Sequence, residues 1–231
     1  MTHSDARPWP GLFEVALEPA AYGALAWQLL GLPLGILGFT WVATGLSLSL
    51  GLAIIGVGLF LGLAYLLACR GLAWADARVA AGLAGQKAPD AAPIPEGRGF
   101  WDRLGQLLKD PASWGAQAFL LLRLPLGIAA FTALITLLCF ALSALVFGLA
   151  PWHRMELGPD GWAHLHAAHW HASVEPEVFA VPERWLRHPG AVRLTAAALG
   201  FGSLIGSLHL AVALTRLEAW LGRALLRGSR A

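Results

Sequence analysis

Charged residues are scarce in this sequence. Asp, Glu, Lys and Arg make up 13% of its 231 residues, against roughly 25% in an average soluble domain. Hydrophobic residues make up 57%, and the mean hydropathy is +0.62. A chain with so little polar surface cannot cover a soluble core of this size. The composition therefore predicts a protein whose solvent is a lipid bilayer.

Other absences argue against further classes of protein. The net charge of +2 is too small to indicate nucleic-acid binding. Cys69 and Cys139 lie inside apolar runs and form neither a disulfide framework nor a C-x-x-C motif. The sequence has no G-x-S-x-G, H-E-x-x-H or P-loop motif, and no paired carboxylates within an apolar run. We therefore expect a non-catalytic protein without a resident cofactor.

Long apolar runs are what the sequence does contain. Residues 24–69 carry no charge over 46 positions, about twice the ~20 residues that cross a bilayer. This run predicts a helical hairpin that turns near residues 47–51. A third run, 118–150, is interrupted only by Arg123, which we interpret as snorkelling to the membrane interface. We therefore predict an all-α integral membrane protein with four transmembrane helices, at about residues 24–47, 50–69, 118–149 and 193–214.

The distribution of positive charge predicts the orientation of these helices. Four crossings place both termini on one side, where the N-terminal segment, the 70–123 connection and the tail carry twelve Lys and Arg residues. The external insertion at 151–192, with its flanking Arg193, carries four. By the positive-inside rule, both termini and the central connection are expected in the cytoplasm.

The central connection divides into two parts. Residues 79–99 are expected to form a cytoplasmic linker, because 87–99 is rich in Pro, Ala and Gly. Residues 100–117 place apolar side chains at helical spacing between polar ones, as does the segment 213–227. Both segments are typical of helices that lie on the membrane surface.

An internal repeat organises the chain. Residues 18–40 match residues 110–132 at a constant offset of 92, with 14 of 23 positions identical. The match includes Pro33 and Gly35, which correspond to Pro125 and Gly127. A second motif, R-x-x-A-W, also occurs twice: it ends at Trp74 in the first half and at Trp220 in the second.

We interpret the chain as a single membrane domain of two parallel helical-hairpin repeats, 18–78 and 110–224. Glu18 and Asp110 are expected to cap their helices, with proline at the first helical position. Pro33 and Pro125 are expected to kink them. Glycine pairs at small-xxx-small spacing predict close helix packing, either within the monomer or at a homodimer seam. Only the second repeat holds the external insertion.

The repeated LPLGI-x-x-FT, the segment GLSLSLGLAIIGVGLFL and the DPASW entry resemble the bacterial "putative sensor" family over residues 18–224. The resemblance implies a four-helix module of the bacterial cytoplasmic membrane, often fused in front of a histidine kinase, with no catalytic residues to transfer. No phosphoacceptor helix or kinase region follows here. Signalling is therefore expected to pass to a kinase or other membrane protein in trans, unless the chain is a fragment.

Four histidines crowd the external loop: His164, His166, His169 and His171. On a helix, only His166 and His169 would be close enough on one face to chelate a metal. A strand–turn–strand would let all four face one another, although Ala167-Ala168 is a poor tight turn. Three interpretations stay open: an ordinary solvated loop, a Zn, Ni or Cu site, and a proton sensor. Further ligands could come from Asp160, Glu175, Glu177, His153 and His188.

His209 is the remaining candidate, because ionisable residues inside a membrane span are costly. His209 would either have a functional role or form a structural hydrogen bond with Thr40, Thr44, Thr132 or Ser207. The whole sequence thus predicts a sensor or regulatory module whose partners are the lipid bilayer and a separate protein. The alternatives are an accessory subunit of a larger membrane complex and a metal-binding membrane protein.

Overall fold

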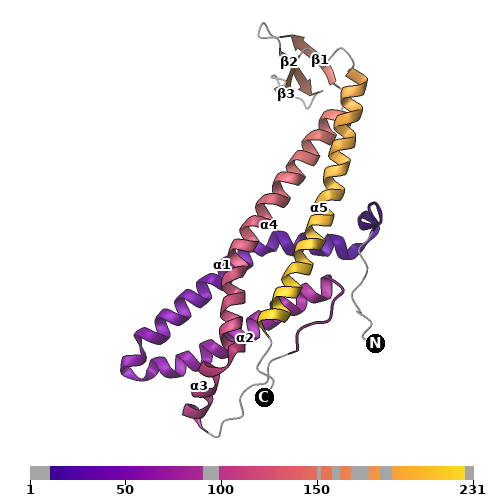
Figure 1. The fold of residues 1–231 in the computed structure, drawn as a ribbon. Coiled ribbons are helices and arrows are strands. Elements are labelled where there is room, and N and C mark those ends of the chain that lie inside the picture. Colours follow the sequence, from indigo (N-terminus) through magenta and orange to yellow (C-terminus); the bar gives the residue numbers. More distant parts are fainter. Residues whose placement is uncertain are drawn as a thin grey trace, which may run out of the picture. The chain divides into compact units, whose positions relative to one another are not determined.

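Four long helices dominate the computed structural model, which describes residues 11–90, 99–149, 152–157, 162–167, 177–182 and 189–226 (Figure 1). Each is long and apolar enough to cross a membrane. The chain is thus a multi-pass membrane protein, as its composition predicts. The four helices are α1 (Pro19–Gly51), α2 (Val57–Leu83), α4 (Pro111–Leu149) and α5 (Pro189–Leu225).

The hairpin between α1 and α2 turns later than expected. Helix α1 continues through the predicted turn to Gly51, and a short 3-10 helix, η2 (Ala53–Ile55), follows. The reversal comes at Gly56, whose φ of 78° is left-handed and therefore favours glycine. The Ser and Leu residues at 47–50 adopt ordinary helical backbone angles, so α1 continues through them.

The two expected surface helices also differ from the prediction. The first is α3 (Phe100–Lys109), which stops at Asp110 because a residue before proline is pushed into extended conformation. Helix α4 then starts at Pro111. The second, 213–227, is not a separate helix, because α5 continues without a break to Leu225.

The described chain forms two compact units, and the first consists of residues 1–134 and 208–231. Within it, α1 packs along α2 (Figure 1). The buried face of α2 is lined by small residues at helical spacing, among them Cys69, Ala73 and Ala77. Leu104 and Leu107 of α3 join the same core. Small side chains let the helices approach closely, which is how helices associate in a membrane.

Helices α1 and α4 cross at the repeated glycines. A Cβ on Gly35 would lie 2.8 Å from the backbone oxygen of Arg123, and a Cβ on Gly127 would collide with the carbonyl of Gly31. The two contacts are reciprocal, because Gly35 corresponds to Gly127 and Gly31 to Arg123 at the offset of 92. Pro33 and Pro125 both lie inside their helices, close to this crossing.

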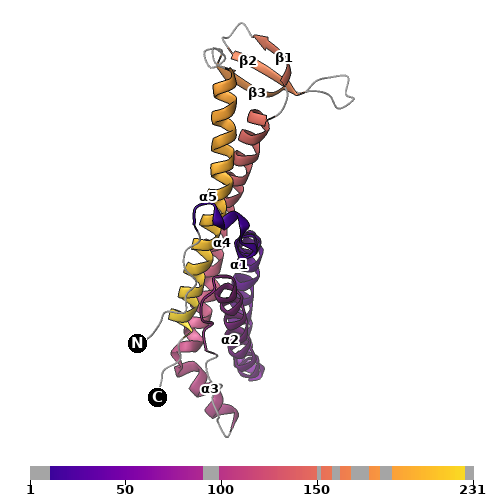
Figure 2. The same ribbon diagram turned by 90° about the vertical axis from the view of Figure 1, so that its right-hand side faces the viewer.

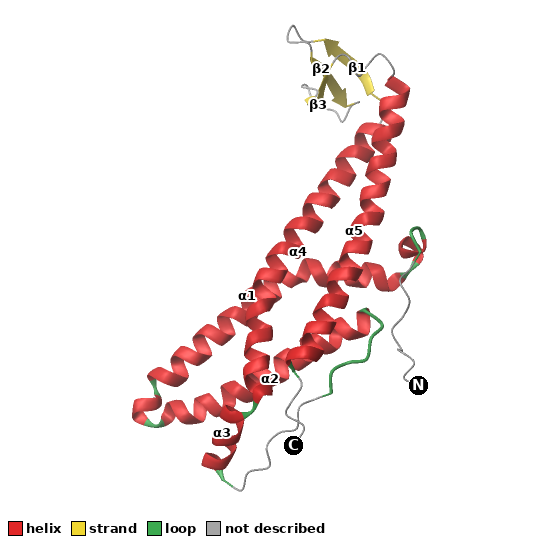
Figure 3. Cartoon of the chain, viewed as in Figure 1, coloured by secondary structure: helices red, strands yellow, loops and turns green. Residues whose placement is uncertain are grey.

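The second unit, residues 135–207, contains three strands as well as parts of α4 and α5. Ser203 of α5 donates a hydrogen bond to the Leu137 carbonyl (3.0 Å), and Arg193 donates to the Gly148 carbonyl (3.2 Å). The insertion, expected as a loop, carries an antiparallel sheet in the order β1-β2-β3 (Figure 2). Its strands are β1 (Trp152–Leu157), β2 (Trp162–Ala167) and β3 (Glu177–Pro182), drawn yellow in Figure 3.

Candidate functional site

The histidine cluster is divided by the secondary structure. His164 and His166 lie on β2, so the helical interpretation is wrong for this part of the insertion. His169 and His171 lie outside the described residues. The backbone register pairs His164 with Glu156 and His166 with Glu177. Among the residues that the structure describes, no group of three His, Cys, Asp or Glu side chains is arranged to hold a metal.

His209 contacts the N-terminal segment. Its Nε2 lies 3.3 Å from the backbone oxygen of Leu12, just before the 3-10 helix η1 (Glu14–Leu17). This contact links α5 to the segment that leads into α1. A bond from His209 to Thr40, Thr44, Thr132 or Ser207 stays a prediction.

The two R-x-x-A-W tryptophans have different surroundings. Trp74 donates its Nε1 hydrogen to the Pro89 carbonyl (3.1 Å), and the Arg78 guanidinium lies 5.1 Å from its ring centre. Trp220 leaves 57% of its surface exposed on α5. Trp74 therefore fastens the linker to α2, whereas Trp220 is available to lipid or to another protein.

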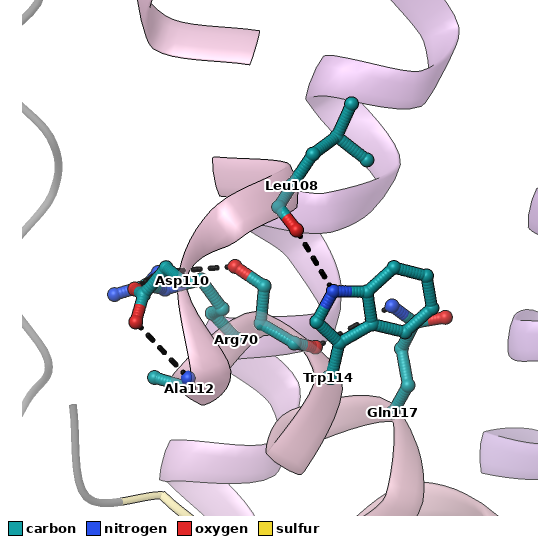
Figure 4. Close-up of polar contacts among 7 residues, drawn as sticks. Arg70, Leu108, Asp110, Ala112, Trp114 and Gln117 are labelled. Atoms are coloured by element: carbon teal, nitrogen blue, oxygen red, sulfur yellow. Dashed lines mark hydrogen bonds and ion pairs between the residues drawn. The ribbon is translucent and has the colours of Figure 1, made fainter. Parts of the chain in front are cut away.

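Arg70 joins α2 to the start of α4 (Figure 4). Its guanidinium forms an ion pair with Asp110 and donates to the Ser113 hydroxyl (3.2 Å). The other carboxylate oxygen of Asp110 accepts from the Ala112 N–H (3.1 Å), which confirms Asp110 as the helix cap. The Glu18 side chain makes no capping hydrogen bond to α1, contrary to expectation.

The segments before α1 and α4 fold back in the same way. Trp114 donates to the Leu108 carbonyl, and Tyr22 donates to the Ala16 carbonyl, each at 2.9 Å. The two donors, Tyr22 and Trp114, are 92 residues apart, and so are the two acceptors, Ala16 and Leu108. The buried residues Val15 and Leu107 are related by the same offset. The sequence comparison missed this extension because the segments share few identical residues before position 18.

Arg123 does not snorkel to the interface but lies buried, with 2% of its side chain exposed. Its Nε is 3.2 Å from a carboxylate oxygen of Asp76 on α2, and its Nη1 forms an ion pair with Glu218 on α5. Arg123, Asp76 and Glu218 are supplied by three different helices. Desolvation of a lone guanidinium is costly, so the paired position is preferred once both acids are within reach.

Helix α1 completes this group with neutral side chains. The Trp27 ring lies 5.1 Å from the Arg123 guanidinium carbon, and its Nε1 donates to Glu218 (3.0 Å). Gln28 is fully buried and donates to the Thr215 hydroxyl (3.1 Å); with its amide turned over, it donates to Glu218 (3.2 Å) and accepts from Thr215 (3.1 Å). We call the six residues the Arg123 cluster: Trp27, Gln28, Asp76, Arg123, Thr215 and Glu218.

The Arg123 cluster is charged and asymmetric. Two carboxylates face one guanidinium, which leaves one negative charge in excess when all three are ionised. The guanidinium nitrogens lie near these charges without being aligned for hydrogen bonds to any described residue. At the corresponding positions of the other repeat stand Gly31 for Arg123, Gly222 for Asp76 and Leu72 for Glu218. Charge is therefore confined to one of two related interfaces.

Sequence reasoning missed the cluster because it assigned Asp76 to the central connection and Glu218 to a surface helix. The sequence did contain one signal. Asp76 follows the first R-x-x-A-W motif by two residues, and Glu218 lies inside the second, on segments that continue the spans. Helices α2 and α5 extend past the predicted span ends and carry both acids into the packed region.

A family model described as "Putative sensor" matches residues 9–226, nearly the whole chain, and confirms the resemblance seen in the sequence. No curated protein and no solved structure matches the chain.

Proposed function

Because the chain belongs to the "Putative sensor" family, we propose that it is a non-catalytic sensor module of the bacterial cytoplasmic membrane. It receives a signal from outside the cell or from within the bilayer, and passes it to a separate protein. A histidine kinase or another membrane protein in trans is the partner that this role requires.

The observation that carries this proposal is the Arg123 cluster. Its charged and polar contacts connect α1, α2, α4 and α5, so displacement of one span alters the electrostatic surroundings of the other three. Buried ionic groups tolerate little misalignment, because a separated charge loses its partner without regaining water. Such a cluster transmits movement between spans better than apolar packing alone does.

The output is placed at the cytoplasmic ends of the spans. All cluster residues belong to the half of each helix that adjoins a terminal segment or the central connection, which the positive-inside rule assigns to the cytoplasm. Trp220 lies two residues from Glu218 and is exposed, so a partner that contacts Trp220 would respond to the state of the cluster.

A photoreactive amino acid at position 220 would test this proposal in native membranes. The proposal predicts crosslinking to a signalling protein, with a yield that changes in E218Q, where one cluster carboxylate is neutral. The matched control is D90N, which neutralises an exposed acid. Crosslinking to an abundant membrane complex, with equal yield in all proteins, would instead favour an accessory subunit. Absence of any crosslink would contradict the proposal.

Metal binding at the insertion is the second candidate, and the register of the sheet favours it. The pairing of β2 with β3 places His166 directly opposite Glu177, one of the acids considered as an additional ligand. Calorimetric titration of metal-stripped protein with Zn(II), Ni(II) and Cu(II) tests the site. Stoichiometric binding that is lost when His164, His166, His169 and His171 become Ala would support it, and equal binding by both proteins would exclude it.

A further inference from the structure

The Arg123 cluster contains more acid than base. With Asp76, Glu218 and Arg123 all ionised, its net charge is −1, in a region where the three side chains are 15%, 5% and 2% exposed. An uncompensated charge that is removed from water is expensive, and a titratable group in this position avoids the cost by binding a proton.

The two carboxyl groups are not equivalent. Glu218 accepts a hydrogen bond from the Trp27 N–H at 3.0 Å and, with the Gln28 amide turned over, from Gln28 Nε2 at 3.2 Å; it also forms an ion pair with Arg123 Nη1. Among the described residues, the one such contact of Asp76 is its ion pair with Arg123 Nε, at 3.2 Å. Hydrogen bonds to a carboxylate stabilise its ionised form, so Glu218 is the acid that keeps its charge. Asp76 is also the more exposed of the two, which gives water access to it.

The charged groups around Asp76 come from two neighbouring helices. Among the described residues they are Arg123 of α4 and Glu218 of α5, and α1 contributes only the neutral Trp27 and Gln28. On α2 itself, Arg78 lies over the Trp74 ring instead. Protonation of the cluster therefore depends on two carboxyl groups, Asp76 and Glu218, that pair with the same guanidinium.

We propose that Asp76 is a proton switch: its carboxylate takes up one proton from water, which cancels the surplus charge and leaves Arg123 paired with Glu218 alone. Loss of that proton restores a second anion that attracts the guanidinium toward α2. Proton exchange at Asp76 thus redistributes Arg123 between α2 and α5. The physiological meaning of the switch rests on the proposed sensor function, whereas the proton exchange itself does not.

Thermal unfolding of the purified full-length chain at several pH values tests the switch. In the folded protein Asp76 keeps its proton above about pH 4, where an ordinary aspartate in the unfolded chain has already released it. Stability therefore falls as the pH rises above this value, until Asp76 loses its proton in the folded protein as well. We expect a loss of roughly 3–5 °C in the unfolding midpoint of the wild type for each factor of ten in the folding equilibrium. In D76N, a neutral mimic of protonated Asp76, this component of the pH dependence is lost.

The matched control is D102N, which neutralises an exposed acid on α3. The other titratable groups contribute equally to all three proteins, so the difference between D76N and D102N isolates Asp76. The same pH dependence in D76N and the wild type would overturn the proposal. So would failure of D76N to fold, because Asn reproduces the neutral form.

Infrared spectroscopy supplies a second readout that needs no stability measurement. Above about pH 5.5, where ordinary carboxyl groups are ionised, the carbonyl stretch of a protonated carboxyl group should still be present in the wild type, disappear as the pH rises further, and be absent from D76N. A pH-dependent band that persists in D76N would refute the assignment to Asp76. If the pH response fails but crosslinking at position 220 still depends on E218Q, only the proton switch is wrong. If the pH response is observed but crosslinking at position 220 does not depend on E218Q, the proton switch stands and the proposed sensor function is wrong.

Discussion

Arg123 occupies the position that Gly31 holds 92 residues earlier in the chain. In both repeats the backbone at this point touches the other repeat, since Gly35 packs on Arg123 and Gly127 packs on Gly31. Only Arg123 carries a side chain away from the contact, into a space bounded by Asp76 and Glu218. Together with the differences at Asp76 and Glu218, this residue difference makes one of two similar interfaces charged.

Loss of the Arg123 charge should destabilise the protein strongly. R123Q leaves two carboxylates facing each other without a counter-charge, and breaking a buried ion pair in this way costs about 3–5 kcal/mol. The control is R78Q, which removes an exposed arginine and its cation–π contact with Trp74 and should change stability by no more than about 1 kcal/mol. Unfolding in detergent measures both. Equal effects of the two substitutions would show that the ion pairs contribute nothing.

At the scale of the helices, close approach decides which glycines are essential. Gly127 faces the carbonyl of Gly31 across the α1–α4 crossing, where the neighbouring atoms are backbone and cannot move aside. Gly202, by contrast, has open space where its Cβ would be, although it lies on a helix of similar composition. Small-residue spacing in the sequence does not distinguish these two situations.

Substitution by alanine should therefore affect these two glycines differently. G127A pushes α1 away from α4 and should cost about 1–3 kcal/mol, the usual range for overpacking. G202A adds a methyl group to open space and improves helix propensity, so it should be neutral or stabilising by up to about 1 kcal/mol. Thermal unfolding of the two variants compares them directly. If G202A were the more damaging, Gly202 would have to lie in a contact with another chain.

At the scale of the whole molecule, orientation in the membrane follows from charge. Twelve of the sixteen Lys and Arg residues fall in the terminal segments and the central connection, and four fall in or beside the insertion. Short loops that are rich in Lys and Arg stay in the cytoplasm. The insertion with its sheet is therefore expected outside, opposite the termini.

Cysteine labelling on intact cells checks this orientation. In a background where Cys69 and Cys139 are replaced by alanine, an impermeant thiol reagent should label D160C in the insertion but not D90C in the linker. Labelling of D90C in permeabilised cells is the control for its reactivity. Labelling of D90C alone on intact cells would invert the topology and place the proposed output on the wrong side.

Much of this protein is determined by its sequence alone. Four spans, the membrane as solvent and the family follow from long uncharged runs and from repeated motifs, because bilayer thickness imposes a minimum length on any crossing helix. Asp110 is recognisable as a cap from the acid–proline pair, which acts over neighbouring residues only. Features of this kind depend on composition or on local backbone chemistry.

Tertiary structure alone decided the Arg123 cluster and the sheet. Asp76, Arg123 and Glu218 are far apart in the chain, and each resembles an interfacial residue until α2, α4 and α5 are packed together. The strands of the insertion likewise depend on pairing with one another, and the sequences of β1 and β3 do not alternate regularly between polar and apolar residues. Burial and partner choice are properties of packed elements, and no single segment carries them.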